Sequence, residues 1–137
     1  DPHNLGSIIR SAECAGAHGV MIPKRRRASV TAAACKASAG AVEYMKVARV
    51  SNLAGAIDRR KDEGLWIAGA DMEGTEMTKA DLKGAIGLVI GSEGDGLSRL
   101  IREKCDFLVS IPMSGHIDSL NAAVAAAILM FEKKRQG

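Results

Sequence analysis

The polar side chains with the clearest chemical potential stand beside the most apolar segment of the chain. Ser119 and Asn121 lie at the start of a predicted helix, Leu120 to Lys134, whose residues up to Phe131 are apolar except for Asn121. The Ser119 hydroxyl is expected to cap this helix by accepting a backbone amide. A helix without a polar face is buried in a core or a subunit interface. Polar groups placed there need partners, so either a ligand binds here or this is an ordinary capped core helix.

A second candidate site is the glycine-rich loop Gly91 to Gly96, which follows the continuous apolar stretch Ala85 to Ile90. Open α/β sheets bind ligands beyond the carboxyl ends of their strands, and glycines let the backbone approach a ligand closely. The glycine spacing matches neither a Rossmann fingerprint nor a P-loop. The Glu93 carboxylate would repel phosphate, so the loop suits a ligand that carries donors or positive charge. A plain glycine turn is the alternative.

Cationic residues form a third group. The run Lys24 to Arg27, with Lys24, Arg25 and Arg26 as candidate RNA contacts, can meet nucleic-acid phosphates. A charge run is more often only a solvated loop. Arg10 follows the apolar pair Ile8 and Ile9 on a predicted helix, where an exposed surface arginine is the commoner explanation.

Composition narrows the function further. Aromatic residues make up only 3% of the chain, too few for the stacking platforms that hold single-stranded bases. The net charge of +3 permits an anionic partner without requiring one. The three histidines and three cysteines lack metal-ligand spacing, so we expect no metal. An odd number of widely spaced cysteines, with no signal peptide or membrane span, favours a cytoplasmic protein with reduced thiols.

Strand and helix patterns alternate along the chain, which predicts an α/β fold with a mainly parallel sheet and helices on both faces. We expect one domain over residues 1–137, with its first strand missing upstream because the sequence opens in a loop. Asn4 is expected to cap the first helix, and 71–84 is polar and turn-rich. The predicted helices are 5–15, 31–38, 52–63, 97–104 and 120–134, and the predicted strands are 19–22, 44–50, 65–70, 85–90 and 107–111.

Three segments together resemble the motifs of one enzyme family, in that family's order. Asn4-Leu-Gly-Ser-Ile-Ile-Arg10 is similar to the first motif of the SpoU (TrmH-type) RNA ribose 2′-O-methyltransferases of the SPOUT superfamily. The stretch from Leu88 to Leu97 resembles the second motif, and the stretch from Ile111 to Ala127 the third. The opening Asp-Pro-His-Asn and the run Pro23-Lys-Arg-Arg26 resemble most the branch that methylates a guanosine ribose in 23S rRNA, although related tRNA enzymes share the core.

The resemblance implies S-adenosylmethionine as cofactor, a C-terminal trefoil knot, and a homodimer packed through the last helix. It also implies an RNA-binding domain upstream of Asp1 and no membrane association. By carry-over, the cofactor contacts are Gly91, Ile111, Leu120, Ala68, Gly69, Ile90 and Met113. The reacting end is expected to be lined by Asn4, Arg10, Glu93, Ser119 and Asn121.

Within that family Arg10 is the favoured group at the acceptor ribose. A guanidinium stays protonated in proteins, so it is a poor base; its firmer role is to hold a phosphate and stabilise alkoxide charge. Two other functions stay open, a non-catalytic RNA-binding SPOUT domain and a nucleotide-binding oxidoreductase. The second lacks the glycine fingerprint, and only the first would bind S-adenosylmethionine.

Overall fold

The structure is a computed structural model that describes residues 2–23, 46–91, 96–116 and 120–137, with side chains from Asn4 onward. It divides into two compact units, Asp1–Leu53 and Ala54–Gly137, and each unit is described by itself. The predicted helix over 31–38 lies outside the described residues. Whether residues 1–137 act as one domain stays a prediction.

The first unit contains one helix and a two-stranded parallel sheet. Helix α1 spans Pro2–Cys14, and strands β1 (Gly19–Pro23) and β2 (Lys46–Val50) pair in register from Gly19 with Lys46 to Pro23 with Val50. Leu5, Ile9 and Ala12 form the buried apolar face of α1. The predicted cap at Asn4 is wrong. The helix starts at Pro2, because proline suits the first helical turn, where its missing N–H has no partner to lose.

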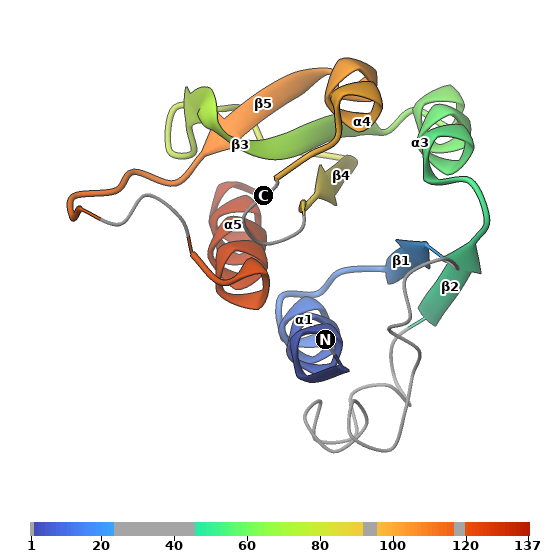
Figure 1. Cartoon of the computed structure of the whole chain (residues 1–137), viewed down its shortest axis with the longest axis horizontal. Coiled ribbons are helices and arrows are strands. Elements are labelled where there is room, and N and C mark those ends of the chain that lie inside the picture. Colours follow the sequence, from blue (N-terminus) through green and yellow to red (C-terminus); the bar gives the residue numbers. More distant parts are fainter. Residues whose placement is uncertain (1, 24–45, 92–95, 117–119) are drawn as a thin grey trace. The chain divides into compact units, whose positions relative to one another are not determined.

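The second unit is built on three parallel strands in the order β4–β3–β5 (Figure 1). These are β3 (Trp66–Glu76), β4 (Ile86–Val89) and β5 (Phe107–Ser110), and the helices are α3 (Leu53–Asp62), α4 (Arg99–Lys104) and α5 (Ala122–Gln136). Every strand pair in the described part of the chain is parallel. The α/β class with parallel strands is therefore confirmed, while the coverage of both faces stays a prediction.

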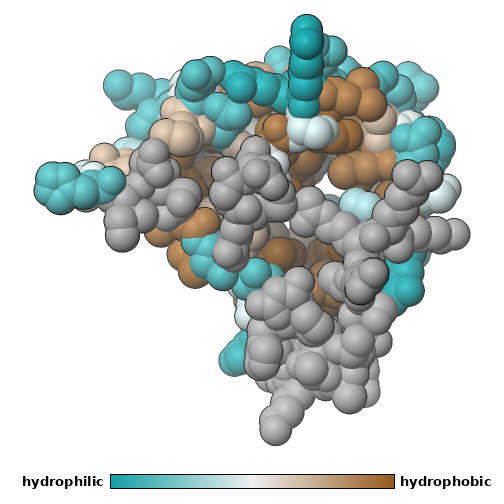
Figure 2. Space-filling model, viewed as in Figure 1, coloured by the Kyte–Doolittle hydropathy of each residue, from teal (hydrophilic) through white to brown (hydrophobic). Residues whose placement is uncertain are grey.

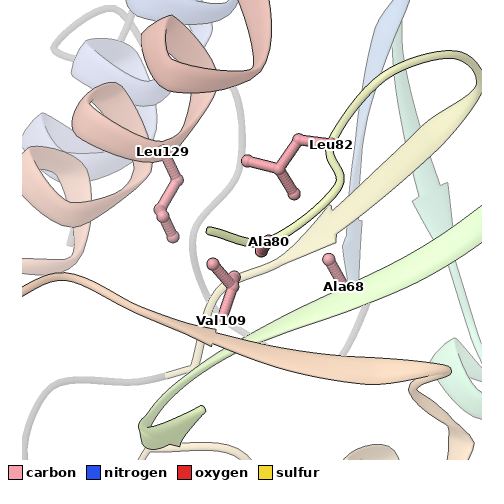
Figure 3. Packing of buried hydrophobic residues seen from close by; sticks show 5 residues of the cluster. All are labelled: Ala68, Ala80, Leu82, Val109 and Leu129. Atoms are coloured by element: carbon pink, nitrogen blue, oxygen red, sulfur yellow. The ribbon is translucent and has the colours of Figure 1, made fainter. Parts of the chain in front are cut away.

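A small aliphatic core holds α5 against this sheet. Figure 3 shows five buried side chains meeting from β3, β5, α5 and the segment before β4: Ala68, Ala80, Leu82, Val109 and Leu129. Four of the five are completely inaccessible to solvent or nearly so, and none is aromatic. This core consists of alanine, valine and leucine, which agrees with the aromatic-poor composition.

Strand β3 runs six residues beyond the predicted end at Ala70, so the turn-rich assignment of 71–76 is wrong. Its pairing with β5 jumps between Ala70 and Thr75, both level with Val109, which makes a wide bulge. Gly74 lets β3 come back to β5 after the bulge. Any other residue would place its Cβ only 2.5 Å from the Leu108 carbonyl carbon. The Ser110 hydroxyl donates to the Gly74 carbonyl at 3.0 Å and fastens the bulge. Polar residues in 71–76 therefore mark an irregular strand.

Two helix starts also differ from expectation. Helix α5 begins at Ala122 with Asn121 as its N-cap, not Ser119, because Asn121 Oδ1 accepts from the backbone amides of Ala123 at 2.8 Å and Val124 at 3.3 Å. Asparagine is as good an N-cap as serine. Helix α4 begins at Arg99 and is capped by Ser98, whose hydroxyl accepts from the Ile101 amide at 3.3 Å.

Candidate functional site

The carboxyl ends of β4 and β5 place two predicted motifs at one edge of the second unit's sheet. Val89 and Leu108 both pair with Gly69 on the central strand, so they lie level on either side of it. Gly91 follows Val89 by two residues and Ile111 follows Leu108 by three. Since two strand spacings are about 10 Å, the glycine loop and the segment after β5 flank one edge of the sheet. This is where a parallel sheet binds its ligand.

The ends of the glycine loop close tightly on each other. A Cβ at Gly91 would lie 2.6 Å from the Leu97 amide nitrogen and nearer still to the Gly96 carbonyl group. Gly96 itself has φ +66°, a left-handed conformation that glycine adopts at little cost. Both glycines are thus required by the loop's own backbone. Glu93 lies outside the described residues.

On the other side, the chain beyond β5 supplies apolar side chains and open backbone. Ile111 is half-buried and packs against the core, whereas Met113 is 40% exposed. Residues 112–116 belong to no helix or strand and are exposed. Ile90, at the end of β4, is also half-buried against the core. Ile90, Ile111 and Met113 can therefore contact an apolar ring, and the backbone after β5 can offer hydrogen bonds.

Ala68 and Gly69 are buried in the central strand β3, below the residues that follow β4 and β5. Ala68 is fully buried in the aliphatic core, and a Cβ at Gly69 would meet Cys105 Sγ, Leu97 and Leu108 at 2.6 to 3.1 Å. Burial raises the pKa of the Cys105 thiol, with the nearby Asp106 charge adding to the effect. In this arrangement Ala68 and Gly69 support the strands that carry the site. Their direct contact with a cofactor stays a prediction.

The start of α5 gives Asn121 a structural task. Its Oδ1 holds two amides of the first helical turn, and Leu120, just before it, is half-buried. Ser119 lies outside the described residues, as do Lys24, Arg25 and Arg26. A catalytic part for Asn121 would have to operate alongside its capping bonds.

Arg10 and Asn4 share helix α1 in the first unit. Arg10 is exposed and, among the described residues, forms no ion pair, while Asn4 is half-buried. Six residues of helix put the two side chains about 120° apart around its axis. Because the helix starts at Pro2, Arg10 lies more than two turns from its start. The described geometry assigns these two residues to one element and the strand-end residues to another unit.

Ion pairs that the sequence patterns did not predict join α4, the helix after the glycine loop, to strand β3. Arg102 Nη2 donates to Glu73 Oε2 at 2.7 Å, and Arg102 Nη1 lies 3.5 Å from Asp71 Oδ2. The bond to Glu73 raises the pKa of Arg102. Both carboxylates sit in the bulged part of β3, so recognising them required the strand extension that the sequence did not reveal.

Among the residues that the structure describes, no group of three or more His, Cys, Asp or Glu side chains is placed to hold a metal ion. None of the helices among the described residues is long and apolar enough to cross a membrane.

Comparison with known proteins identifies the family. The family model described as "SpoU rRNA Methylase family" matches residues 1–131, almost the whole chain. The chain belongs to the SpoU methylase family. The resemblance seen in the three motifs is thereby confirmed.

Relatives match almost the whole of this chain. A protein of Staphylococcus saprophyticus, assigned to the TrmH family of tRNA/rRNA methyltransferases, is 52% identical over 137 residues, which cover 99% of this chain and 55% of the relative. The chain thus spans about half the length of that relative.

Solved structures also match almost the whole of this chain. The SpoU methyltransferase AviRb from Streptomyces viridochromogenes, in complex with the cofactor AdoMet, is 34% identical with a TM-score of 0.90, covering 99% of this chain and 56% of AviRb. An RNA 2′-O ribose methyltransferase is 30% identical with a TM-score of 0.88, covering 99% of this chain and 52% of that protein.

Proposed function

We propose that this chain is the catalytic part of an RNA methyltransferase that moves a methyl group from S-adenosylmethionine to a ribose 2′-hydroxyl. The observation that carries the proposal is the SpoU family match over residues 1–131, which includes all three motifs. The AdoMet complex of AviRb supports the cofactor, and the related RNA 2′-O ribose methyltransferase supports the acceptor. As substrate we favour a guanosine in 23S rRNA, with tRNA as the alternative.

The residues at the strand ends fit this cofactor. S-adenosylmethionine combines an apolar, hydrogen-bonding adenosine with a cationic sulfonium, and it supplies an activated methyl group that needs no metal. Ile90, Ile111 and Met113 offer apolar contacts, and the backbone around Gly91 and after Ile111 offers hydrogen bonds. The remaining predicted contacts, Leu120, Ala68 and Gly69, would complete the site or support it from below.

The acceptor side is assigned to Arg10 with Asn4, Glu93, Ser119 and Asn121. The Arg10 guanidinium is exposed and forms no ion pair in the described part of the chain. Its N–H groups can therefore donate to a phosphate next to the ribose. Amide groups such as that of Asn4 can orient Arg10 and the ribose. In-line placement of the hydroxyl at about 3 to 3.5 Å from the methyl group is the main requirement of the reaction. We also propose the family's C-terminal trefoil knot and an RNA-binding domain upstream.

A homodimer through α5 is part of the same proposal. One side of the helix packs inward at Ala123, Ala126 and Leu129, but Val124 and Phe131 are 46% and 45% exposed. These two lie seven residues apart, so they share one face of the helix. Hydrophobic residues also reach the surface drawn in Figure 2. An aliphatic helix with a second open apolar face is suited to a subunit interface.

Sedimentation at micromolar concentration should therefore show dimer alone. Phe131→Glu places a charge in the proposed interface and should give a folded monomer, whereas Lys134→Glu, an exposed position near the polar end of the same helix, should leave the dimer intact. A wild-type monomer with unchanged helix content would contradict the interface.

Calorimetric titration separates the proposal from the oxidoreductase alternative. The protein should bind S-adenosylmethionine and should not bind a nicotinamide dinucleotide, because the loop lacks the phosphate-binding glycine pattern. Binding of the dinucleotide alone would overturn the assignment. Cofactor binding without methyl transfer to any RNA would favour the non-catalytic SPOUT domain.

A further inference from the structure

An open pocket of about 380 Å³ lies where the end of α5 meets the segment before β4. Three cationic side chains, Lys79, Lys83 and Arg135, help to form its wall, together with Thr78, Ala80, Asp81 and Gln136. None of these residues belongs to the predicted cofactor or acceptor site. The pocket is therefore a separate feature of the second unit.

The wall of this pocket is held rigidly by a buried carboxylate. Glu132 is only 7% exposed, and its oxygens accept from Arg135 Nε at 2.8 Å and Arg135 Nη2 at 2.7 Å. Gln136 Nε2 donates to the same carboxylate at 2.7 Å and to the Met77 carbonyl at 3.1 Å. The bonds from Arg135, and then that from Gln136, lower the pKa of Glu132 to about 2. The carboxylate therefore stays charged and keeps Arg135 in place at neutral pH.

Gln136 also ties the two sides of the pocket together. Its Oε1 accepts from the Leu82 amide at 2.8 Å, while Leu82 is fully buried in the aliphatic core. The segment that carries Lys79 and Lys83 is thus fastened to α5 from both ends of one side chain. The backbone that carries the two lysines is therefore fixed, and Arg135 is held by its bonds to Glu132. This guanidinium loses little conformational freedom when it binds an anion.

The cations of the pocket keep most of their donors for a partner. Arg135 spends two of its five N–H groups on Glu132, yet its side chain is 62% exposed. Lys79 forms no ion pair within the described residues, and Lys83 lies 3.9 Å from Asp81 with both side chains largely exposed. An exposed ion pair of that length contributes little free energy, so it leaves Lys83 able to bind another anion. The Asp81 carboxylate belongs to the pocket wall, and Glu76, which accepts from Thr78, is a further carboxylate nearby.

We propose that this pocket binds the phosphate backbone of the RNA substrate and helps to position it on the enzyme. The inference rests on the proposed function for the identity of the anion. The Arg135 guanidinium is held by Glu132 through Nε and Nη2, and its remaining N–H groups can donate to two oxygens of a phosphate. Two lysines on the facing segment add charge without base specificity. The pocket is too open to enclose a small ligand, which favours a site on an extended polyanion.

The test measures RNA affinity against salt concentration for wild type, the double variant Lys79→Gln with Lys83→Gln, and a charge-matched control, Lys46→Gln with Arg59→Gln. Bulk tRNA and a large-subunit rRNA transcript serve as probes. Affinity falls as salt rises, and each lost phosphate contact makes the plot of log affinity against log salt less steep by about 0.7 to 0.9. The pocket variant, which loses two contacts, should therefore have a slope less steep by about 1.4 to 1.8 than that of wild type. The control should keep the wild-type slope. Cofactor affinity should stay unchanged in both.

Arg135→Gln provides a second variant that should weaken RNA binding as well, but with reduced stability because it strands the Glu132 charge. A slope in the lysine variant equal to that of wild type, while wild type still methylates RNA, would overturn the pocket assignment alone. Wild type that binds no RNA at all would overturn both this inference and the proposed function. Saturation of the pocket by millimolar inorganic phosphate, with RNA affinity unaffected, would make it a small-anion site instead.

Discussion

Arg10→Ala is expected to slow methyl transfer by ~10²-fold or more, as removal of other transition-state donors does. The side chain is exposed on α1 and makes no ion pair in the described part of the chain, so its loss should change the free energy of unfolding by no more than about 0.5 kcal/mol. Cofactor affinity should not move, because Arg10 acts on the acceptor. Single-turnover methylation of RNA at saturating cofactor measures the effect.

Two further variants sharpen this result. Arg59→Ala removes another exposed helical arginine and should keep the wild-type rate. Arg10→Lys should restore little activity, since an ammonium lacks the bidentate fork of a guanidinium. Near-wild-type rates in Arg10→Ala and Arg10→Lys would return Arg10 to a surface role. The acceptor-activating group would then have to be sought at Glu93 or Asn121.

Gly91→Ala is expected to weaken S-adenosylmethionine binding by about 10- to 100-fold, and Gly91→Val by more. The new Cβ would collide with the backbone at Gly96 and Leu97, so the loop must open to accept it. Overpacking of this kind costs about 1 to 3 kcal/mol, and each 1.4 kcal/mol is about tenfold in affinity. The effect arises from the shape of the loop and would not require the side chain to touch the cofactor.

Gly64→Ala is the matched control for this experiment. Gly64 has φ +98°, and a Cβ there would meet nothing within 4 Å, so the substitution strains the backbone at the end of α3 without crowding. It should lower stability and leave cofactor affinity unchanged. Calorimetry on both variants decides the matter. Equal affinities in wild type and Gly91→Ala would remove the loop from the cofactor site.

Local patterns predicted the elements well where packing agreed with them. Most of the continuous apolar run that ends at Ile90 is strand β4, which pairs with β3, and Leu5, Ile9 and Ala12 form the buried face of α1. Gly64 ends its helix region in a left-handed conformation, as expected for a C-terminal glycine. These signals are short-range, so the sequence alone carries them.

The failures lie where a distant contact decides the outcome. The polar segment after Ala70 continues as a strand because it pairs with β5 again beyond the bulge. The Ser110 hydroxyl on β5 donates to the Gly74 carbonyl at this pairing, which no local pattern encodes. At α5, both Ser119 and Asn121 were suitable caps, and the choice of Asn121 depends on where the helix begins to pack. No local pattern indicates the cationic pocket either, because Lys79 and Arg135 are far apart in the sequence.

The proposed function is tested most directly by methylating RNA from cells that lack this gene, using the protein and S-adenosylmethionine labelled in its methyl group. A 2′-O-methyl group blocks alkaline cleavage of the adjoining phosphodiester, so the product can be read without knowing the site. We predict label in an alkali-resistant dinucleotide that contains guanosine and derives from large-subunit rRNA, with tRNA as the alternative source. Label on a base, released by alkali in a mononucleotide, or no transfer to either RNA despite cofactor binding, would contradict ribose methylation.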